Sequence, residues 1–112
     1  MKEIFDINAD ELDQYLDESK AVVLLIWKKH CSLCARFKPI FKELPEEYPD
    51  IQFLRMNMME TMENLRLAEK YEAETTPIIP VFCHGEHLGT FVGLYEEDEF
   101  KLKLEEMLEK NC

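Results

Sequence analysis

The chain has 112 residues, of which 46% are hydrophobic, and its 24 acidic and 13 basic residues give a formal net charge of −11. This length suits one domain, residues 1–112, and is too short for two. Because so acidic a surface repels phosphate groups, the charge argues against nucleic acid and membrane surfaces as partners.

The first half of the chain predicts strands and helices in alternation. Residues 2–7 are expected to form a short strand, and Asn8 followed by Glu11 resembles a capping box that opens a helix. Residues 21–27, AVVLLIW, are a continuous aliphatic and β-branched run, which is typical of a central strand buried on both faces. A helix is predicted over residues 32–47. One of its faces carries Cys34, Phe37, Phe41 and Leu44.

The second half predicts a strand at 51–58, a helix at 60–71, a hairpin of strands at 78–83 and 88–92, and a last amphipathic helix at 96–110. In the 51–58 strand Gln52 is expected on the polar side. Pro80 is awkward inside a strand because proline cannot donate a ladder hydrogen bond. The order βαβαβαββα predicts an α/β fold, a central mixed sheet flanked by helices on both faces.

The chemistry expected of the four cysteines depends on whether the protein's compartment is oxidising or reducing. The N-terminal segment lacks the apolar stretch of a signal peptide, so we expect a cytoplasmic protein, where thiols are kept reduced. Four cysteines there are not expected to form a disulfide framework. Cys31 and Cys34 have C-x-x-C spacing, which indicates redox or metal chemistry. Cys83 and Cys112 stand alone, and Cys112 is expected to be a free thiol.

Cys31 falls where a buried strand ends and a helix begins. The unpaired N–H groups and positive dipole end of a helix stabilise a thiolate there, which activates Cys31 as the attacking nucleophile. Cys34 lies one turn further on, at a helical separation that allows a disulfide without backbone movement. Cys31 would attack a substrate disulfide, and Cys34 would then resolve the mixed disulfide. Lys28, Lys29 and His30 add positive charge or a proton carrier beside the thiol.

A metal site is the alternative chemistry for a C-x-x-C pair. Zinc needs two further ligands, and Cys83 is six residues beyond Pro77, about 20 Å along a strand. Cys83, His84 and His87 around the hairpin turn form another candidate, without a clear fourth ligand. We therefore predict no metal site.

The chain resembles the thioredoxin family over nearly its whole length. The resemblance rests on Trp27 four residues before Cys31, the Cys31-Ser32-Leu33-Cys34 motif, Pro39, Thr76-Pro77, Gly85 and Val92-Gly93. It implies the thioredoxin fold and thiol–disulfide oxidoreductase activity on protein disulfides, with Cys31 and Cys34 as the catalytic residues.

The resemblance also implies roles for the residues around the dithiol. Pro77 would be the family's cis-proline, with Pro80 as the competing candidate, and Thr76 would offer backbone groups to an extended substrate. Gly93 would complete the substrate groove, while Trp27 and His30 would support the active site. No cofactor beyond the Cys31–Cys34 disulfide is implied; the expected partners are protein disulfides and a disulfide reductase as electron donor, and the protein is expected to be a monomer.

Departures from the family pattern leave an alternative open. His30 replaces the usual Trp before the first cysteine, Ser32-Leu33 replaces Gly-Pro, and Leu25 stands where a buried acid is usual. A non-catalytic peptide-binding module of the same fold would tolerate these changes. A metal-binding carrier is a further, weaker alternative.

Overall fold

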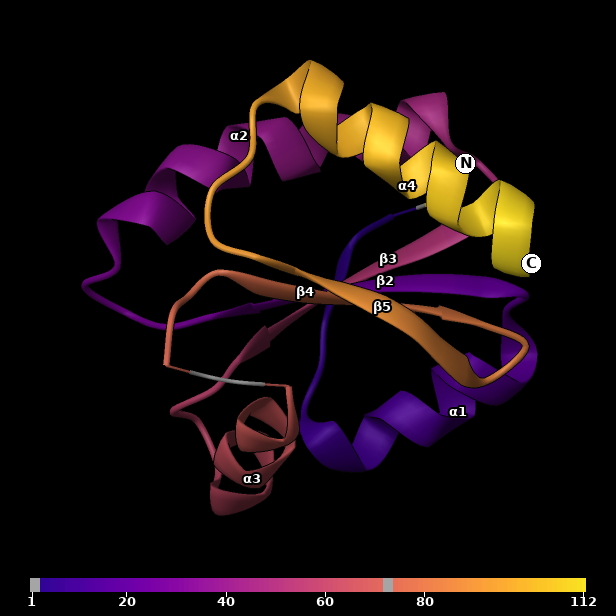
Figure 1. The fold of residues 1–112 in the computed structure, drawn as a ribbon. Helices are drawn as coiled ribbons and strands as arrows, with labels where there is room; N and C mark the ends of the chain where they lie inside the picture. Colours follow the sequence, from indigo (N-terminus) through magenta and orange to yellow (C-terminus); the bar gives the residue numbers. More distant parts are fainter. Residues whose placement is uncertain (1–2, 72–73) are drawn as a thin grey trace.

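The computed structural model describes residues 3–71 and 74–112. Its elements are β1 (Phe5–Asp6), the 3-10 turn η1 (Ala9–Glu11), α1 (Leu12–Glu18), β2 (Ala21–Trp27), α2 (Ser32–Glu47), β3 (Ile51–Asn57), α3 (Met62–Lys70), β4 (Ile78–Cys83), β5 (Glu86–Val92) and α4 (Glu97–Asn111) (Figure 1). The predicted order βαβαβαββα is confirmed. Lys2 of the predicted first strand lies outside the described residues. Helix α3 begins two residues later than predicted because the Thr61 side chain caps it, accepting from the Asn64 backbone N–H at 2.9 Å.

The five strands form a mixed sheet in the order β1-β3-β2-β4-β5. Strands β1, β3 and β2 are parallel, whereas β4 is antiparallel to both β2 and β5. The aliphatic run Ala21–Trp27 therefore occupies the centre, as its composition predicted, and its first six residues are buried. This arrangement brings the carboxyl end of β2 and the start of β4 to the same edge of the sheet, because Ile26 pairs with Ile78.

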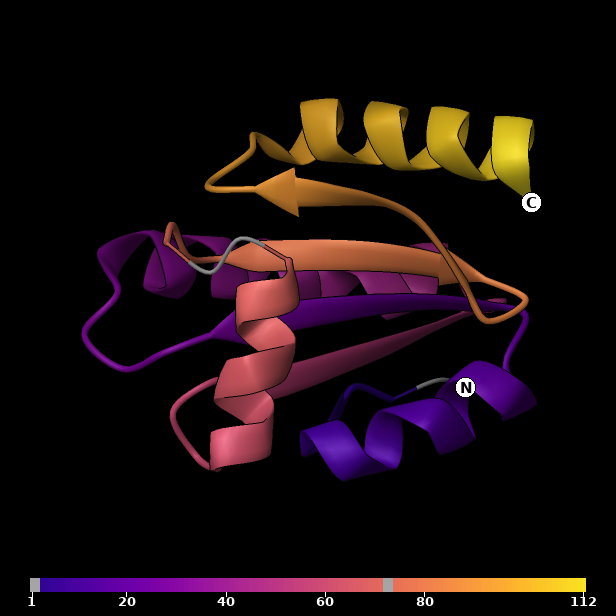
Figure 2. The same ribbon diagram turned by 60° about the horizontal axis from the view of Figure 1, so that its bottom comes forward.

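Helices cover both faces of the sheet, so the core has two layers (Figure 2). Helices α2 and α4 lie on one face, where Phe37 and Phe100 meet edge to face with their ring centroids 5.2 Å apart. Helices α1 and α3 lie on the other face through Leu12 and Ala68. Lys101 ties α4 to α2 through an ion pair of 2.8 Å with Glu47. Within the described ranges, every helix is too short or too polar to cross a membrane.

Strand β3 differs from the expected alternation. Its first four residues are all buried, including Gln52, which is only 8% exposed. The reason is tertiary: β1 and β2 flank β3, and helices cover both faces of the sheet. The Gln52 side chain remains satisfied because its Nε2 donates to the carbonyl oxygens of Glu3 (3.1 Å) and Phe53 (3.2 Å).

Pro80 is accommodated inside β4 by an interrupted ladder. Strand β2 pairs residues 21–23 with residues 83–81 of β4 and then Ile26 with Ile78, so the pairing skips Leu24 and Leu25, and Leu24 is the residue opposite Pro80. A proline lacks the N–H that a continuous ladder would require at this position. A register shift between Val81 and Phe82 also interrupts pairing with β5.

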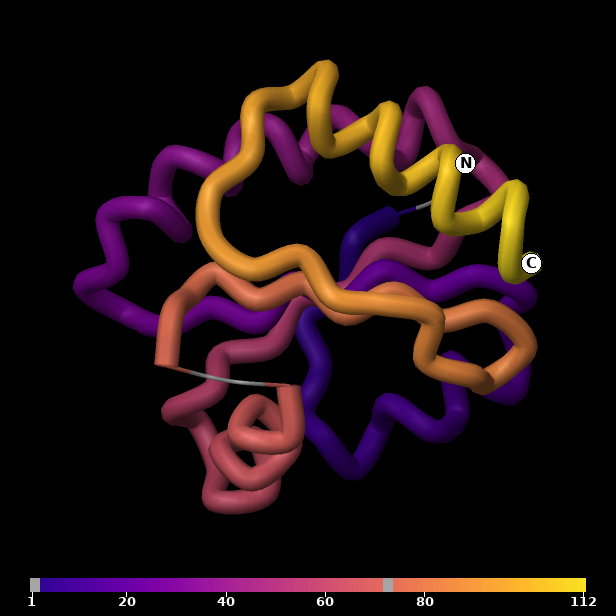
Figure 3. Tube along the Cα trace, viewed as in Figure 1, coloured from indigo at the N-terminus to yellow at the C-terminus, as the bar shows by residue number. Residues whose placement is uncertain are grey.

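The prediction that Cys83 and Cys112 stand alone is wrong, because the structure joins them in a disulfide with a Cα–Cα distance of 5.7 Å. Cys83 ends β4, and Cys112 follows α4, whose C-terminal end reaches the edge of the sheet where β2 begins (Figure 3). Local sequence patterns did not predict this contact because the two cysteines are 29 residues apart. Of the other residues in the hairpin group, His87 packs its ring on the rings of Tyr71 and Phe82.

Candidate active site

The Cys31–Cys34 pair stands at the junction of β2 and α2. Cys31 is the N-cap residue of α2, with extended backbone angles of φ −113° and ψ 104°, and its Sγ accepts from the Cys34 backbone N–H at 3.1 Å. The two cysteines form a disulfide with a Cα–Cα distance of 5.3 Å. Cys34 is buried at 7% exposure and Cys31 is half-buried, so Cys31 offers the sulfur that a substrate can reach.

A capping sulfur is well placed for thiolate chemistry. The N–H groups of the first helical turn have no partners within the helix, and the helix dipole puts partial positive charge at that end. When the pair is reduced, the Cys34 N–H, 3.1 Å from Cys31 Sγ, and the positive end of the helix dipole both act on the Cys31 sulfur. They favour its ionised form, which is the form that attacks disulfides.

Thr76 meets Cys31 from the other side. The Thr76 hydroxyl donates to Cys31 Sγ at 3.2 Å, and its carbonyl oxygen lies 3.6 Å from the same sulfur. The Thr76–Pro77 peptide bond is cis. Gly93 joins this group because its N–H donates to the Pro77 carbonyl at 2.8 Å, while its φ of +86° suits glycine. The structure thus places Thr76 in contact with Cys31, and Gly93 beside Pro77.

Trp27 and His30 precede Cys31 in the chain, Trp27 at the end of β2 and His30 in the turn that leads to α2. Both line a cleft of about 820 Å³ that also contains Cys31 and Cys34. Trp27 ends β2, and its carbonyl accepts from the Met58 N–H at 2.9 Å, which fixes this end of the strand. The indole nitrogen is buried and makes no hydrogen bond within the described part of the chain. His30 is exposed, with a left-handed φ of 60° that turns the chain from β2 into α2.

The inner wall of this cleft is apolar where the family usually has an acid. Leu25 is 2% exposed, lines the cleft and lies opposite Arg55 in the β2–β3 register. Arg55 also lines the cleft, but its guanidinium is held by Asp6 through two contacts of 2.9 and 3.1 Å. The cation opposite Leu25 is therefore already paired with a carboxylate.

Lys38 and Asp6 are among the cleft residues that sequence reasoning missed. Lys38 lines the cleft because it lies four residues after Cys34 and hence on the same helix face, a signal that the spacing contained. Asp6 lines it because β1 pairs with β3 in the register that puts Asp6 beside Arg55. That register depends on strand order, which no local pattern shows.

Comparisons with known proteins agree with this geometry. A family model described as Thioredoxin matches residues 3–106. The chain is similar to a thioredoxin from Mycoplasmoides gallisepticum, with 28% identity over 94 residues that cover 84% of this chain and 91% of the relative. It is also 28% identical, over 112 residues, to a thioredoxin from Buchnera aphidicola, covering 99% and 98% of the two chains. Among solved structures, a mutant thioredoxin from Halobacterium salinarum superposes with a TM-score of 0.81 and 25% identity, covering 94% and 90% of the two chains.

Proposed function

The chain belongs to the thioredoxin family, and we propose that it is a thiol–disulfide oxidoreductase that reduces protein disulfides in the cytoplasm. One observation carries the proposal: the reachable sulfur of a C-x-x-C disulfide caps helix α2 and contacts Thr76 of the cis Thr76–Pro77 bond. The helix end supports nucleophilic attack by that sulfur. The Thr76 backbone offers a place for an extended substrate segment beside it.

The exchange proceeds in two balanced steps. The Cys31 thiolate attacks one sulfur of the substrate disulfide, a Cys31–substrate bond forms, and the other substrate sulfur leaves as a thiolate that takes up a proton. Cys34, once deprotonated, attacks the Cys31 sulfur and expels the second substrate thiolate. The Cys31–Cys34 disulfide is then closed, as the structure has it. Two electrons have passed to the substrate.

The proposal extends to partners. Closing the Cys31–Cys34 bond leaves the protein oxidised, so a further turnover needs a two-electron donor, which we take to be a disulfide reductase. The dithiol carries the two electrons itself, and we propose that the protein works as a monomer without another cofactor.

Variants of the two cysteines test the activity. Cys31→Ser should abolish reduction of a protein disulfide, because the nucleophile is gone. Cys34→Ser should accumulate mixed disulfides that gel electrophoresis without reductant detects, because nothing resolves them. Cys112→Ser is the matched control, since its sulfur lies at the opposite edge of the sheet. If Cys31→Ser and Cys34→Ser both turned over at the wild-type rate, the proposal would be wrong.

A redox titration gives the direction of electron flow. Reduced and oxidised Cys31 and Cys34 can be separated by alkylation and mass shift after equilibration in thiol buffers. A single two-electron transition at about −230 to −270 mV would agree with a reductase. A markedly higher potential would instead make the protein an oxidant of its partners.

The buried Leu25 supports a second candidate, a peptide-binding module of the same fold. Because Leu25 occupies the position where the family usually has a buried acid, the described residues hold no carboxylate at that position to assist Cys34. Such a module would retain its partners when both Cys31 and Cys34 are replaced by serine. Loss of all partners from that double variant would exclude it.

A further inference from the structure

The cleft beside the disulfide carries a charge opposite to that of the whole chain. Its charged lining residues are Lys28, Lys29, Lys38 and Arg55 against Asp6, Glu11 and Glu60. Basic side chains therefore outnumber acidic ones here, whereas the chain as a whole has a net charge of −11. A local reversal of sign in a concave surface focuses the potential and selects among charged ligands.

Existing pairings remove some of these charges from consideration. Arg55 is held by Asp6 at 2.9 Å. The Glu11 carboxylate accepts from the Asn8 backbone N–H at 2.9 Å but keeps its charge, so Glu11 and Glu60 remain in the cleft beside its three lysines. The remaining ion pairs found among the described residues belong to Lys101 on α4, so they involve none of the three cleft lysines.

The lysines border the reactive sulfur along the chain. Lys28 and Lys29 form the connection between β2 and Cys31, and Lys38 lies one helical turn beyond Cys34. Lys29 and Lys38 are exposed and Lys28 is half-buried. Cys31 lines this cleft, and its sulfur also contacts Thr76 of the cis Thr76–Pro77 bond.

We propose that the cleft selects protein disulfides whose cysteine is flanked by carboxylates. One part of the substrate segment lies along Thr76, and its acidic side chains lie against Lys28, Lys29 and Lys38. A volume of about 820 Å³ accommodates several side chains of such a segment. The assignment rests on the proposed function, and its chemistry is the exchange written above.

The test compares three disulfide-linked peptide dimers that differ only in charge. Their sequences are acetyl-Glu-Glu-Cys-Gly-amide, its Gln-Gln counterpart and its Lys-Lys counterpart. Single-turnover rate constants with pre-reduced protein are measured at low ionic strength by acid quench and alkylation. The readout is the ratio of the Glu rate constant to the Lys rate constant, because any change in the nucleophilicity of Cys31 divides out.

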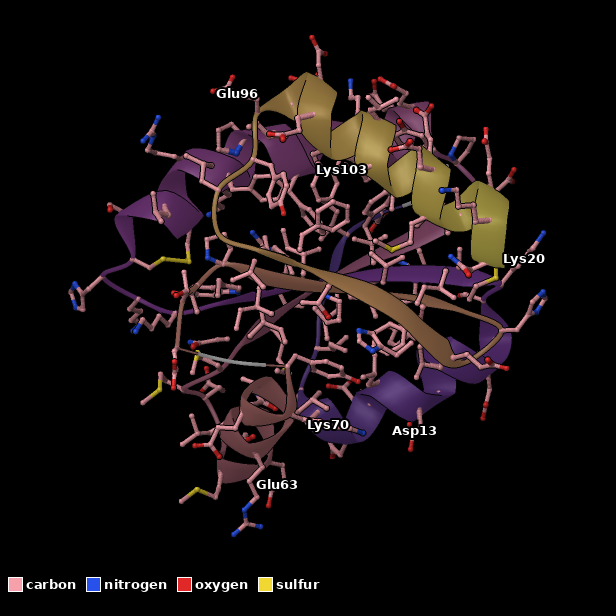
Figure 4. All side chains as sticks on the ribbon, in the orientation of Figure 1. Asp13, Lys20, Glu63, Lys70, Glu96 and Lys103 are labelled. Atoms are coloured by element: carbon pink, nitrogen blue, oxygen red, sulfur yellow. A yellow bond between two sulfur atoms is a disulfide. The ribbon has the colours of Figure 1, made fainter. Side chains whose placement is uncertain are left out.

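Two double variants of equal net charge separate the cleft from the rest of the molecule. Lys28→Gln/Lys29→Gln removes charge beside the disulfide. Lys20→Gln/Lys103→Gln removes the same charge before β2 and on α4, away from the start of α2 (Figure 4). We expect the ratio to fall about five-fold in the first variant and to stay within about two-fold of wild type in the second. Physiological salt should reduce the wild-type preference.

The other possible results separate failure of the proposed oxidoreductase function from failure of the proposed charge selectivity. Failure to reduce the neutral Gln peptide would refute the proposed function itself. Reduction of that peptide with no preference for Glu, or an equal fall of the ratio in both variants, would refute the selective cleft alone. A rate constant for oxidised glutathione above that for the Glu peptide would refute the proposal that the cleft binds a protein segment. It would assign the cleft to a small anionic disulfide instead.

Discussion

The Cys83–Cys112 disulfide should stabilise the fold only under oxidising conditions, and Cys112→Ser isolates its contribution. Cys112 is exposed and Cys83 is 3% exposed. Replacing Cys112 therefore removes the bond without burying a serine hydroxyl, which would add a desolvation cost of its own. The buried Cys83 thiol that remains packs as a small apolar group.

The size of the effect follows from the loop that the bond closes. The two cysteines are 29 residues apart in sequence. Closing a loop of that size lowers the entropy of the unfolded chain enough to stabilise the folded state by about 3.6 kcal/mol at 25 °C in the chain-entropy treatment. For a chain of 112 residues this corresponds to about 15 °C in the midpoint of thermal unfolding.

Urea denaturation followed by circular dichroism measures this difference. Oxidised wild type should exceed oxidised Cys112→Ser by about 3.6 kcal/mol in free energy of unfolding, and a phosphine reductant should bring the two together. The reductant also opens Cys31–Cys34, but it does so in both proteins, so that contribution cancels. Mass spectrometry after alkylation establishes that the bond is present in the oxidised wild type.

Two results would refute the reasoning. Equal unfolding free energies, with the bond shown to be formed, would mean that the loop is already restricted in the unfolded chain. Failure of Cys83 and Cys112 to oxidise under conditions that close Cys31–Cys34 would mean that the end of α4 does not rest where the structure places it.

Three further predictions concern the core, a buried polar network and pH. Leu104→Ala should lower the free energy of unfolding by about 2–5 kcal/mol because Leu104 is fully buried, whereas Leu102→Ala, at a side chain 62% exposed on the same helix, should change it by less than about 0.5 kcal/mol. Equal losses in urea denaturation would contradict the assigned faces of α4. Asn64→Ala should lower the free energy of unfolding by more than about 2 kcal/mol in the same assay, because the buried Asn64 amide makes three hydrogen bonds that link η1 to the end of β3. An unchanged midpoint of urea unfolding would contradict this and show that water replaces those bonds. Burial, and then the hydrogen bond that the Tyr48 hydroxyl donates to Glu105, raise the pKa of Tyr48 above its ordinary value. A raised pKa in the folded state means that this stabilisation is complete below pH ~10 and is lost as the pH rises further. Unfolding free energies measured against pH should therefore fall less steeply above pH ~10 in Tyr48→Phe, and parallel curves would contradict the assignment.

Much of the fold follows from local patterns in the sequence. The aliphatic run at 21–27 indicated a strand buried on both faces, and the spacing of Phe37, Phe41 and Leu44 indicated a helix with one apolar side. The position of Cys31 between these two elements was enough to infer its place at a helix N-terminus. Each of these inferences depends on residues within a few turns of one another.

Contacts between segments that are distant in sequence became known only from the tertiary structure. It buried Gln52 by placing β3 between β1 and β2, paired Cys83 with Cys112, and set Asp6 beside Arg55 at the wall of the cleft. Composition and periodicity report which face of an element is apolar, but strand order and register arise from the packing of all the elements together. The sequence alone therefore determined the elements and the reactive dithiol, whereas only the folded chain determined which charges and which sulfurs are neighbours.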